Sequence, residues 1–244
     1  MTTFVLVCGA WHGPWAWHRV VPLLERAGAR TIIPDLTYTP GTGLDDHVQQ
    51  VIAALAATEA EAATEAEAAT AGGGERVVLV GHSYAGLVVR QAADLRPDRV
   101  GHVVLVDGWA GPDGSSMFTL APDAFVQAIR AATNGGNDKL IPPPAPELFG
   151  ITDPADTAWL AQRLRPQPLR TFTDRTHFTG AVDGIPGTAI YCRPQTFPFE
   201  RLGRAAGYRT IPVDGPHDVM LSAPESLARL LLAEAGAGAV AETP

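Results

Sequence analysis

The chain has 244 residues, of which 46% are hydrophobic, and a formal net charge of −8. This length and composition predict one globular domain with at most a small insertion, and the acidity argues against a nucleic-acid-binding surface. No apolar run reaches the roughly 18 residues that a membrane-spanning helix needs, and the N-terminus lacks the features of a secretion signal. We therefore expect a soluble cytoplasmic protein that binds neither membrane nor nucleic acid. The sequence does not indicate an oligomeric state.

The two cysteines, Cys8 and Cys192, belong to no CxxC motif and no Cys/His cluster. The sequence therefore predicts neither a disulfide framework nor a metal site. We expect no cofactor.

Short apolar runs alternate with amphipathic helical patterns along most of the chain. The predicted strands are 4–7, 30–33, 77–80, 100–106, 188–192 and 208–213. Helices are expected from Pro14 to Gly28, at 44–57, after Gly86, and at 199–206 and 224–235. This alternation predicts an α/β fold with a six-stranded, mostly parallel sheet and helices on both faces.

Two segments interrupt the alternation. Residues 58–74 contain the unit Thr-Glu-Ala-Glu-Ala-Ala twice and end in three glycines; we expect this low-complexity, acidic insertion to prolong the preceding helix into solvent. Residues 109–186 are rich in proline and glycine, with helical patterns at 121–132 and 156–164. A segment this long between two strands is predicted to form a lid, which leaves 1–108 and 187–244 as the core.

The stretch from Val77 to Gly86 combines a strand, a sharp turn and a helix. Gly81 stands two residues before Ser83, and Ala85 and Gly86 stand two and three residues after it. Small neighbours allow the close approach of strand and helix in a nucleophile elbow, where a serine projects from the carboxyl edge of the sheet. Ser83 is therefore the predicted nucleophile.

Two further side chains follow strands and can reach the same edge of the sheet. Asp107 ends the strand 100–106, and His217 follows the last strand. The order serine, acid, histidine is that of the α/β-hydrolases, with His217 as the base that accepts the serine proton. Asp107 is the preferred acid, although Asp214 is closer to His217 in sequence.

The loop after the first strand should help to bind the oxyanion of an acyl-transfer reaction. Its backbone N–H at Ala10, together with that of Tyr84, is the predicted donor pair. Aromatic side chains of the loops are expected to form an apolar substrate pocket. We assign to this pocket Trp11, His12, Trp109 and Phe118; for His12, a structural hydrogen bond is an equal alternative.

Three stretches, 4–18, 81–86 and 215–222, resemble the plant methyl esterase and hydroxynitrile lyase branch of the α/β-hydrolases and its bacterial relatives. The resemblance is strong in the sheet and loose in the lid. It implies an α/β-hydrolase fold, with Ser83 as nucleophile, His217 as base, and Ala10 and Tyr84 as oxyanion donors.

The chain departs from this branch at three positions. Cys8 replaces the histidine that usually begins the first loop, and Gln195 stands where the acid usually does. The acid is therefore Asp107, Asp214 or absent. Asp218 stands where the lyases carry lysine, and a carboxylate there would repel a departing cyanide ion.

These features predict a serine hydrolase that cleaves a carboxylic ester of a small, largely apolar molecule through an acyl-enzyme. The alternative is a lyase or cyclase that uses Ser83 and His217 as a proton shuttle without acyl transfer. The sequence does not name the substrate.

Overall fold

The computed structural model describes residues 1–66, 76–133 and 139–240, and its main sheet has six strands in the order β2-β1-β3-β4-β7-β8. All neighbouring strands pair in parallel. The prediction of a six-stranded α/β sheet is confirmed. The strands are β1 (Thr3–Val7), β2 (Arg30–Ile32), β3 (Val77–His82), β4 (Val100–Val106), β7 (Gly187–Arg193) and β8 (Arg209–Asp214).

The central strands form where the sequence is continuously apolar and β-branched. Every residue of β1 and β3 is buried, and β4 is buried except at one position. Such strands suit the middle of a sheet that is covered on both faces. The pairing of Leu79 with Val5 on one side and with Val103 on the other sets the register of the centre.

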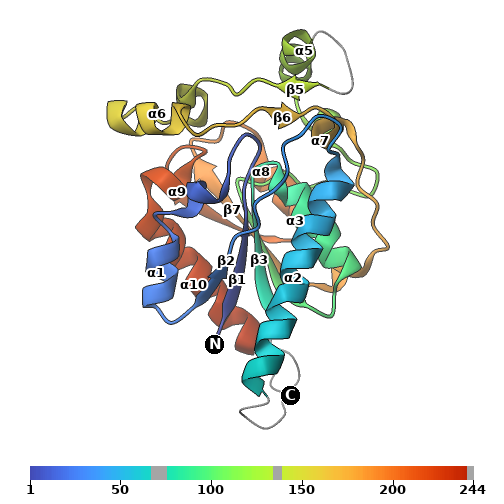
Figure 1. Ribbon diagram of the computed structural model, residues 1–244, viewed down its shortest axis with the longest axis vertical. Coiled ribbons are helices and arrows are strands. Elements are labelled where there is room, and N and C mark those ends of the chain that lie inside the picture. The colour runs from blue at the N-terminus through green and yellow to red at the C-terminus, as the bar shows by residue number, and fades with distance from the viewer. Residues whose placement is uncertain (67–75, 134–138, 241–244) are drawn as a thin grey trace.

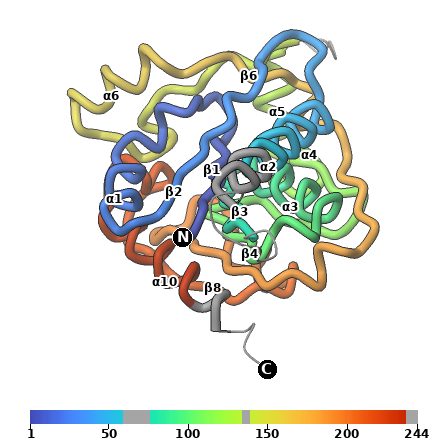
Figure 2. The backbone as a smooth tube through the Cα atoms, turned by 60° about the horizontal axis from the view of Figure 1, so that its bottom comes forward, coloured from blue at the N-terminus to red at the C-terminus, as the bar shows by residue number. Residues whose placement is uncertain are grey.

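Helices cover both faces of this sheet, as Figures 1 and 2 show. The helices α1 (Val21–Arg26) and α10 (Pro224–Val240) lie on one face, and α2 (Leu44–Ala66) and α3 (Ala85–Leu95) on the other. The helix α8 (Phe199–Ala205) packs against β7 and β8. No helix of the described residues is long and apolar enough to cross a membrane.

The single helix expected from Pro14 onward is divided in two. A 3₁₀ turn, η1 (Pro14–Trp17), precedes α1, and Pro22 occupies the first turn of α1. Proline has no backbone N–H to continue a hydrogen-bond ladder from the preceding turn, so a new helix begins there.

The acidic repeat prolongs α2 as far as Ala66. Its first residue belongs to the packed structure, because Thr58 is buried and its hydroxyl accepts a hydrogen bond from Arg99 Nη2 at 3.3 Å. Residues 67–74 of the predicted insertion lie outside the described residues.

The segment 109–186 contains short elements, several of which lie beyond the carboxyl ends of the strands (Figure 1). These elements include an antiparallel pair, β5 with β6, that was not predicted. The elements are α4 (Met117–Leu120), α5 (Asp123–Ala132), β5 (Leu140–Ile141), η2 (Pro146–Phe149), α6 (Pro154–Ala161), β6 (Gln167–Pro168), α7 (Arg170–Thr173) and η3 (Ala181–Gly184).

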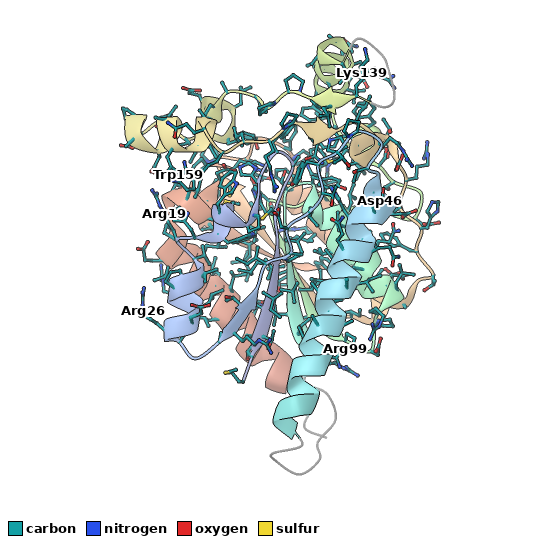
Figure 3. All side chains as sticks on the ribbon, viewed as in Figure 1. Arg19, Arg26, Asp46, Arg99, Lys139 and Trp159 are labelled. Atoms are coloured by element: carbon teal, nitrogen blue, oxygen red, sulfur yellow. The ribbon has the colours of Figure 1, made fainter. Side chains whose placement is uncertain are left out.

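Polar contacts fasten this segment to the core at several places, two of which involve the side chains of Arg19 and Asp94. Arg19 binds both carboxylate oxygens of Asp156 on α6, at 2.9 and 2.5 Å. In Figure 3, Trp159 of α6 lies close to Arg19, whereas Lys139 of the same segment lies away from it at the top of the view. The Asp94 carboxylate of α3 accepts three backbone N–H groups, from Thr179, Gly180 and Val182. The last part of the segment therefore lies beside α3.

Candidate active site

Ser83 lies in the turn that joins β3 to α3, with a left-handed φ of 52°. A Cβ atom on Gly81 would lie 2.7 Å from the Ala85 carbonyl oxygen, and one on Gly86 would lie 2.3 Å from the Trp109 carbonyl oxygen. Both distances are below van der Waals contact, so the turn accommodates no side chain at either glycine. The small residues of the predicted elbow are therefore required by the close approach of backbone segments.

Backbone strain is concentrated at this edge of the sheet. Among the described residues, the non-glycine positions with positive φ are Trp11 (65°), Ser83 (52°) and Asp107 (45°). Such conformations cost roughly 1–3 kcal/mol each and persist where the surrounding structure enforces them. All three residues were assigned to the site from the sequence.

Asp107 and His217 are in direct contact. Asp107 Oδ2 lies 2.9 Å from His217 Nδ1, and its other oxygen accepts the Cys192 backbone N–H at 2.7 Å. The carboxylate is fully buried, and His217 is 8% exposed. Because Nδ1–H donates to the carboxylate, Nε2 of His217 carries the free lone pair.

The two other positions considered for the acid lie elsewhere. The Asp214 side chain is 80% exposed and pairs with Arg193 at 2.8 Å. Gln195 is exposed and accepts the Glu200 backbone N–H at 3.3 Å. Among the described residues it is Asp107, and neither Asp214 nor Gln195, that bonds His217, and β7, the strand before Gln195, provides the Cys192 N–H that orients Asp107.

The loop after β1 runs directly beside Ser83. A Cβ atom on Gly9 would lie 2.9 Å from Ser83 Cβ, so only glycine fits there. The Cys8 thiol donates to the Gly13 carbonyl at 3.0 Å and closes the loop. Burial raises the pKa of this thiol, which keeps it protonated as a donor. Cys8 therefore performs a structural role that needs no histidine.

The two predicted oxyanion donors belong to residues that lie next to Ser83, one in space and one in sequence. Ala10 follows Gly9 and lines the cavity above Ser83. Tyr84 follows Ser83 directly; its ring is buried, and its hydroxyl lies 3.1 Å from His47 Nδ1. The side chain of Tyr84 is thus anchored in the core, and its backbone belongs to the elbow.

A cavity of about 460 Å³ opens above Ser83 and His217, between the sheet and the segment 109–186. Apart from Ser83, His217 and Thr196, the described residues that line it are apolar. The apolar lining comprises Ala10, Trp11, Trp109, Met117, Phe125, Ala128, Ile129, Ala132, Ile141, Pro142, Pro143, Pro144, Leu148, Phe149 and Phe197.

Two of the four residues predicted for the pocket line this cavity, and two do not. Trp11 and Trp109 belong to the lining. Phe118 does not, because its ring packs against Phe172 and beneath the Arg130 guanidinium. His12 does not either, because both of its ring nitrogens make polar contacts within the protein.

Those contacts of His12 link the first loop to the histidine loop. His12 Nδ1 lies 2.7 Å from the Ala10 carbonyl, and Nε2 lies 2.9 Å from Asp218 Oδ2. His82 lies beneath them, with Nε2 at 3.1 Å from the His217 carbonyl. Burial lowers the pKa of His82 well below its usual value, so this ring is neutral.

No pattern in the sequence indicates that Asp218 contacts His12 or that Gln167 reaches the first loop. The Gln167 Oε1 atom accepts the Trp11 backbone N–H at 2.9 Å. Both contacts join residues more than 150 positions apart, so no local pattern predicts them. Among the described residues, no cluster of three or more His, Cys, Asp or Glu side chains is arranged to hold a metal ion.

Residues 4–230 match the alpha/beta hydrolase family over nearly the whole chain. The chain belongs to the α/β-hydrolase family. The carbendazim hydrolyzing esterase of Nocardioides sp. (strain SG-4G) is 29% identical over 260 residues, which cover 96% of this chain and 99% of that protein. Methylesterase 2 of Arabidopsis thaliana is 34% identical over 126 residues, which cover 52% of this chain and 46% of that protein.

Solved structures show the same fold. An extracellular α/β-hydrolase from a Paenibacillus species superimposes with a TM-score of 0.77 at 19% identity, over 96% of this chain and 99% of that one. The predicted resemblance to plant methylesterases and their bacterial relatives is confirmed. So is the prediction of a hydrolase of the carboxylic ester class.

Proposed function

We propose that this α/β-hydrolase cleaves neutral, apolar carboxylic esters through an acyl-enzyme on Ser83. The observation that carries the proposal is the Asp107–His217 contact beside a strained serine, with Ser83 and His217 lining one cavity. His217 Nε2 takes the proton of Ser83 Oγ as this oxygen attacks the ester carbonyl carbon. Asp107 keeps the tautomer that makes Nε2 basic and stabilises the imidazolium that forms.

The negative charge of the tetrahedral intermediate develops on the former carbonyl oxygen. The backbone N–H groups of Ala10 and Tyr84 are the proposed donors to it, since one follows the loop glycine beside Ser83 and the other follows Ser83 itself. Collapse of the intermediate expels the alcohol, which takes the proton from His217. Water then attacks the acyl carbonyl carbon while His217 takes one of its protons. The second tetrahedral intermediate expels Ser83 Oγ, which takes the proton back from His217, and the acid is released.

The lining of the cavity supports an uncharged, apolar substrate. Among the described residues, the lining includes no Asp, Glu, Lys or Arg. A charged substituent would therefore be buried without a partner, which costs several kcal/mol. The similarity to a carbendazim hydrolyzing esterase over nearly the full length of both chains supports ester hydrolysis, and carbendazim is one candidate substrate to test.

This substrate class is tested with pairs of methyl esters that differ by one remote carboxylate. We expect kcat/KM for the neutral ester to exceed that of its charged partner by about 100-fold or more, because each 1.4 kcal/mol of lost binding in the transition state is a factor of ten. Initial rates of methanol release measure the ratio. Equal rates for both members of several pairs would refute the proposed specificity.

A lyase or proton-shuttle reaction is the second candidate, because an alpha-hydroxynitrile lyase of Arabidopsis thaliana is 29% identical over 51% of this chain and 46% of that protein. The structure changes the reason to expect weak cyanohydrin cleavage. Asp218 does not line the cavity, and its charge is paired with His12. What remains is the absence of lysine and arginine from the described lining, so no such cationic side chain there contacts the departing cyanide.

We therefore expect cyanide release from an aromatic cyanohydrin to stay within about tenfold of the solution rate, since no lysine or arginine of the described lining stabilises departing cyanide. A colorimetric cyanide assay, with Ser83→Ala as the control, measures it. Rapid release that depends on Ser83 would favour the lyase.

A further inference from the structure

His12 holds the peptide groups on both sides of Ala10. Its ring Nδ1 lies 2.7 Å from the Ala10 carbonyl oxygen, and its backbone N–H donates to the Gly9 carbonyl at 3.3 Å. Tyr38 adds two hydroxyl contacts to the same loop, at 3.4 Å to the Gly9 carbonyl and at 2.6 Å to the His12 carbonyl.

The orientation of these carbonyls determines where the Ala10 N–H points. In a trans peptide the C=O and N–H bonds point in opposite directions. The Ala10–Trp11 peptide directs its carbonyl to His12 and its N–H to Gln167, so it is fixed at both ends. The Gly9 carbonyl is held by His12 and Tyr38, so the N–H of Ala10 points away from them.

The ring of His12 faces two acceptors, and neither can donate in return. One is the Ala10 carbonyl and the other is the Asp218 carboxylate, at 2.7 and 2.9 Å. Both ring nitrogens therefore carry a proton, and His12 is an imidazolium paired with an aspartate. The two side chains are 1% and 0% exposed, so the pair is shielded from solvent and salt.

We propose that the His12–Asp218 ion pair positions the Ala10 N–H for the oxyanion and places a fixed positive charge beside it. This inference rests on the proposed acyl transfer at Ser83. Asp218 directly follows His217, so one loop carries both the base and the anchor of the oxyanion donor. His12 and Asp218 are thus positioning residues that act through the backbone of the first loop.

The His12–Asp218 ion pair exists only in the pH range in which His12 is protonated and Asp218 is ionised. Burial alone would lower the pKa of His12, but the Asp218 charge and hydrogen bond, with the Ala10 carbonyl, outweigh it and raise that pKa. A group with a raised pKa contributes below that pKa and loses its contribution as the pH rises through it. The pair is therefore lost on the alkaline side.

Other titratable groups face the pair from the surrounding elements. His82 and His217 face Asp218, with His82 Nε2 at 3.9 Å from its Oδ1. Burial would raise the pKa of Asp218, but His12 and these two histidines lower it, so the carboxylate stays ionised at neutral pH. Two titratable side chains contact the His12 carbonyl: Arg165 donates to it at 3.2 Å, and the Tyr38 hydroxyl donates to it at 2.6 Å. Cys8 lies in the same loop as His12 and bonds the Gly13 carbonyl.

Two variants separate the charge of the pair from its hydrogen bonds. In Asp218→Asn, the amide can donate to His12 Nε2, so His12 keeps its Nδ1–H bond to Ala10 but becomes neutral. In His12→Phe with Asp218→Leu, both the charge and the bond to Ala10 are removed, and no buried charge is left unpaired. Glu234→Gln is the matched control, because Glu234 is a buried carboxylate 3.6 Å from His102, near the amino ends of β4 and β7.

Steady-state kinetics on a neutral ester from pH 5 to 10, with melting temperatures, test the inference. For Asp218→Asn we expect kcat to fall about tenfold with KM within about twofold, and the alkaline limb due to His12 to disappear. For the double variant we expect a loss on the order of 10²-fold in kcat, as for removal of one oxyanion donor. Glu234→Gln should lower the melting temperature and leave kcat and the pH profile unchanged.

An unchanged kcat and pH profile in folded Asp218→Asn and in the folded double variant would overturn the inference and leave the proposed function intact. If the wild-type protein hydrolyses no ester, the proposed function fails separately. In that case, NMR tests the ion pair directly. The imidazole ¹⁵N resonances report the protonation of His12, and the amide resonances of Ala10 and Trp11 report the position of the loop. Two protonated nitrogens in the wild type, and displaced amides in the double variant, support it. A neutral His12, or unmoved amides, contradicts it.

Discussion

Replacing Ser83 by alanine should reduce kcat for a neutral ester by roughly 10⁶-fold, because nucleophile, base and acid act as one unit in acyl transfer. The serine is held at φ 52° beside the cavity, and its turn has no space for larger neighbours. Alanine keeps the Cβ and removes only the attacking oxygen, so the fold should be retained. Stopped and continuous assays of acid release, with circular dichroism, measure both properties.

Ser226→Ala is the matched control for this substitution. Ser226 lies on α10, and its hydroxyl accepts a hydrogen bond from Arg229 at 3.1 Å. We expect this variant to keep wild-type turnover. If Ser83→Ala also kept near-wild-type turnover, acyl transfer through Ser83 would be ruled out.

Replacing Asp107 by asparagine should lower kcat by on the order of 10³ to 10⁴. Asparagine tolerates the left-handed φ of 45° at this position. Its oxygen can still accept the Cys192 N–H, but its NH₂ group would then face His217 Nδ1. That contact stabilises the tautomer with the proton on Nε2, which cannot accept the proton of Ser83. The melting temperature should therefore change little while the base is inactivated.

Asp214→Asn is the matched control, since Asp214 is exposed and pairs with Arg193. It should keep kcat within about twofold, because an exposed ion pair contributes little. Loss of activity in Asp214→Asn with full activity in Asp107→Asn would reassign the acid. Full activity in both would mean that Ser83 and His217 act as a dyad.

The order and type of the core elements could be predicted because their signals are local. The apolar runs at β1, β3 and β4 indicate strands that are buried on both faces. The small residues around Ser83 indicate the nucleophile elbow. The break between η1 and α1 was missed because the apolar spacing continues across Pro22. The pair β5–β6 was missed because strands of two residues have no readable period.

The acid and the role of His12 were open at the level of sequence for a different reason. Asp107 and Asp214 both follow strands, and only the direction of each side chain distinguishes them. One points to His217, and the other points into solvent. His12 was considered for the pocket or for a structural hydrogen bond, and the deciding partner, Asp218, lies 206 residues away in sequence. Contacts between loops that are distant in sequence produce no periodic pattern from which they could be predicted.

The mass of the acyl-enzyme tests acyl transfer through Ser83 most directly. The protein is mixed with a p-nitrophenyl ester whose acyl-enzyme hydrolyses slowly, and the reaction is quenched in acid within the first turnover. The protein is then digested, and the peptide masses are measured by mass spectrometry. We predict a peptide that contains Ser83 and is heavier by the acyl group, and no such adduct in Ser83→Ala. Full release of p-nitrophenol without an adduct, or with the acyl group on another residue, would contradict acyl transfer through Ser83.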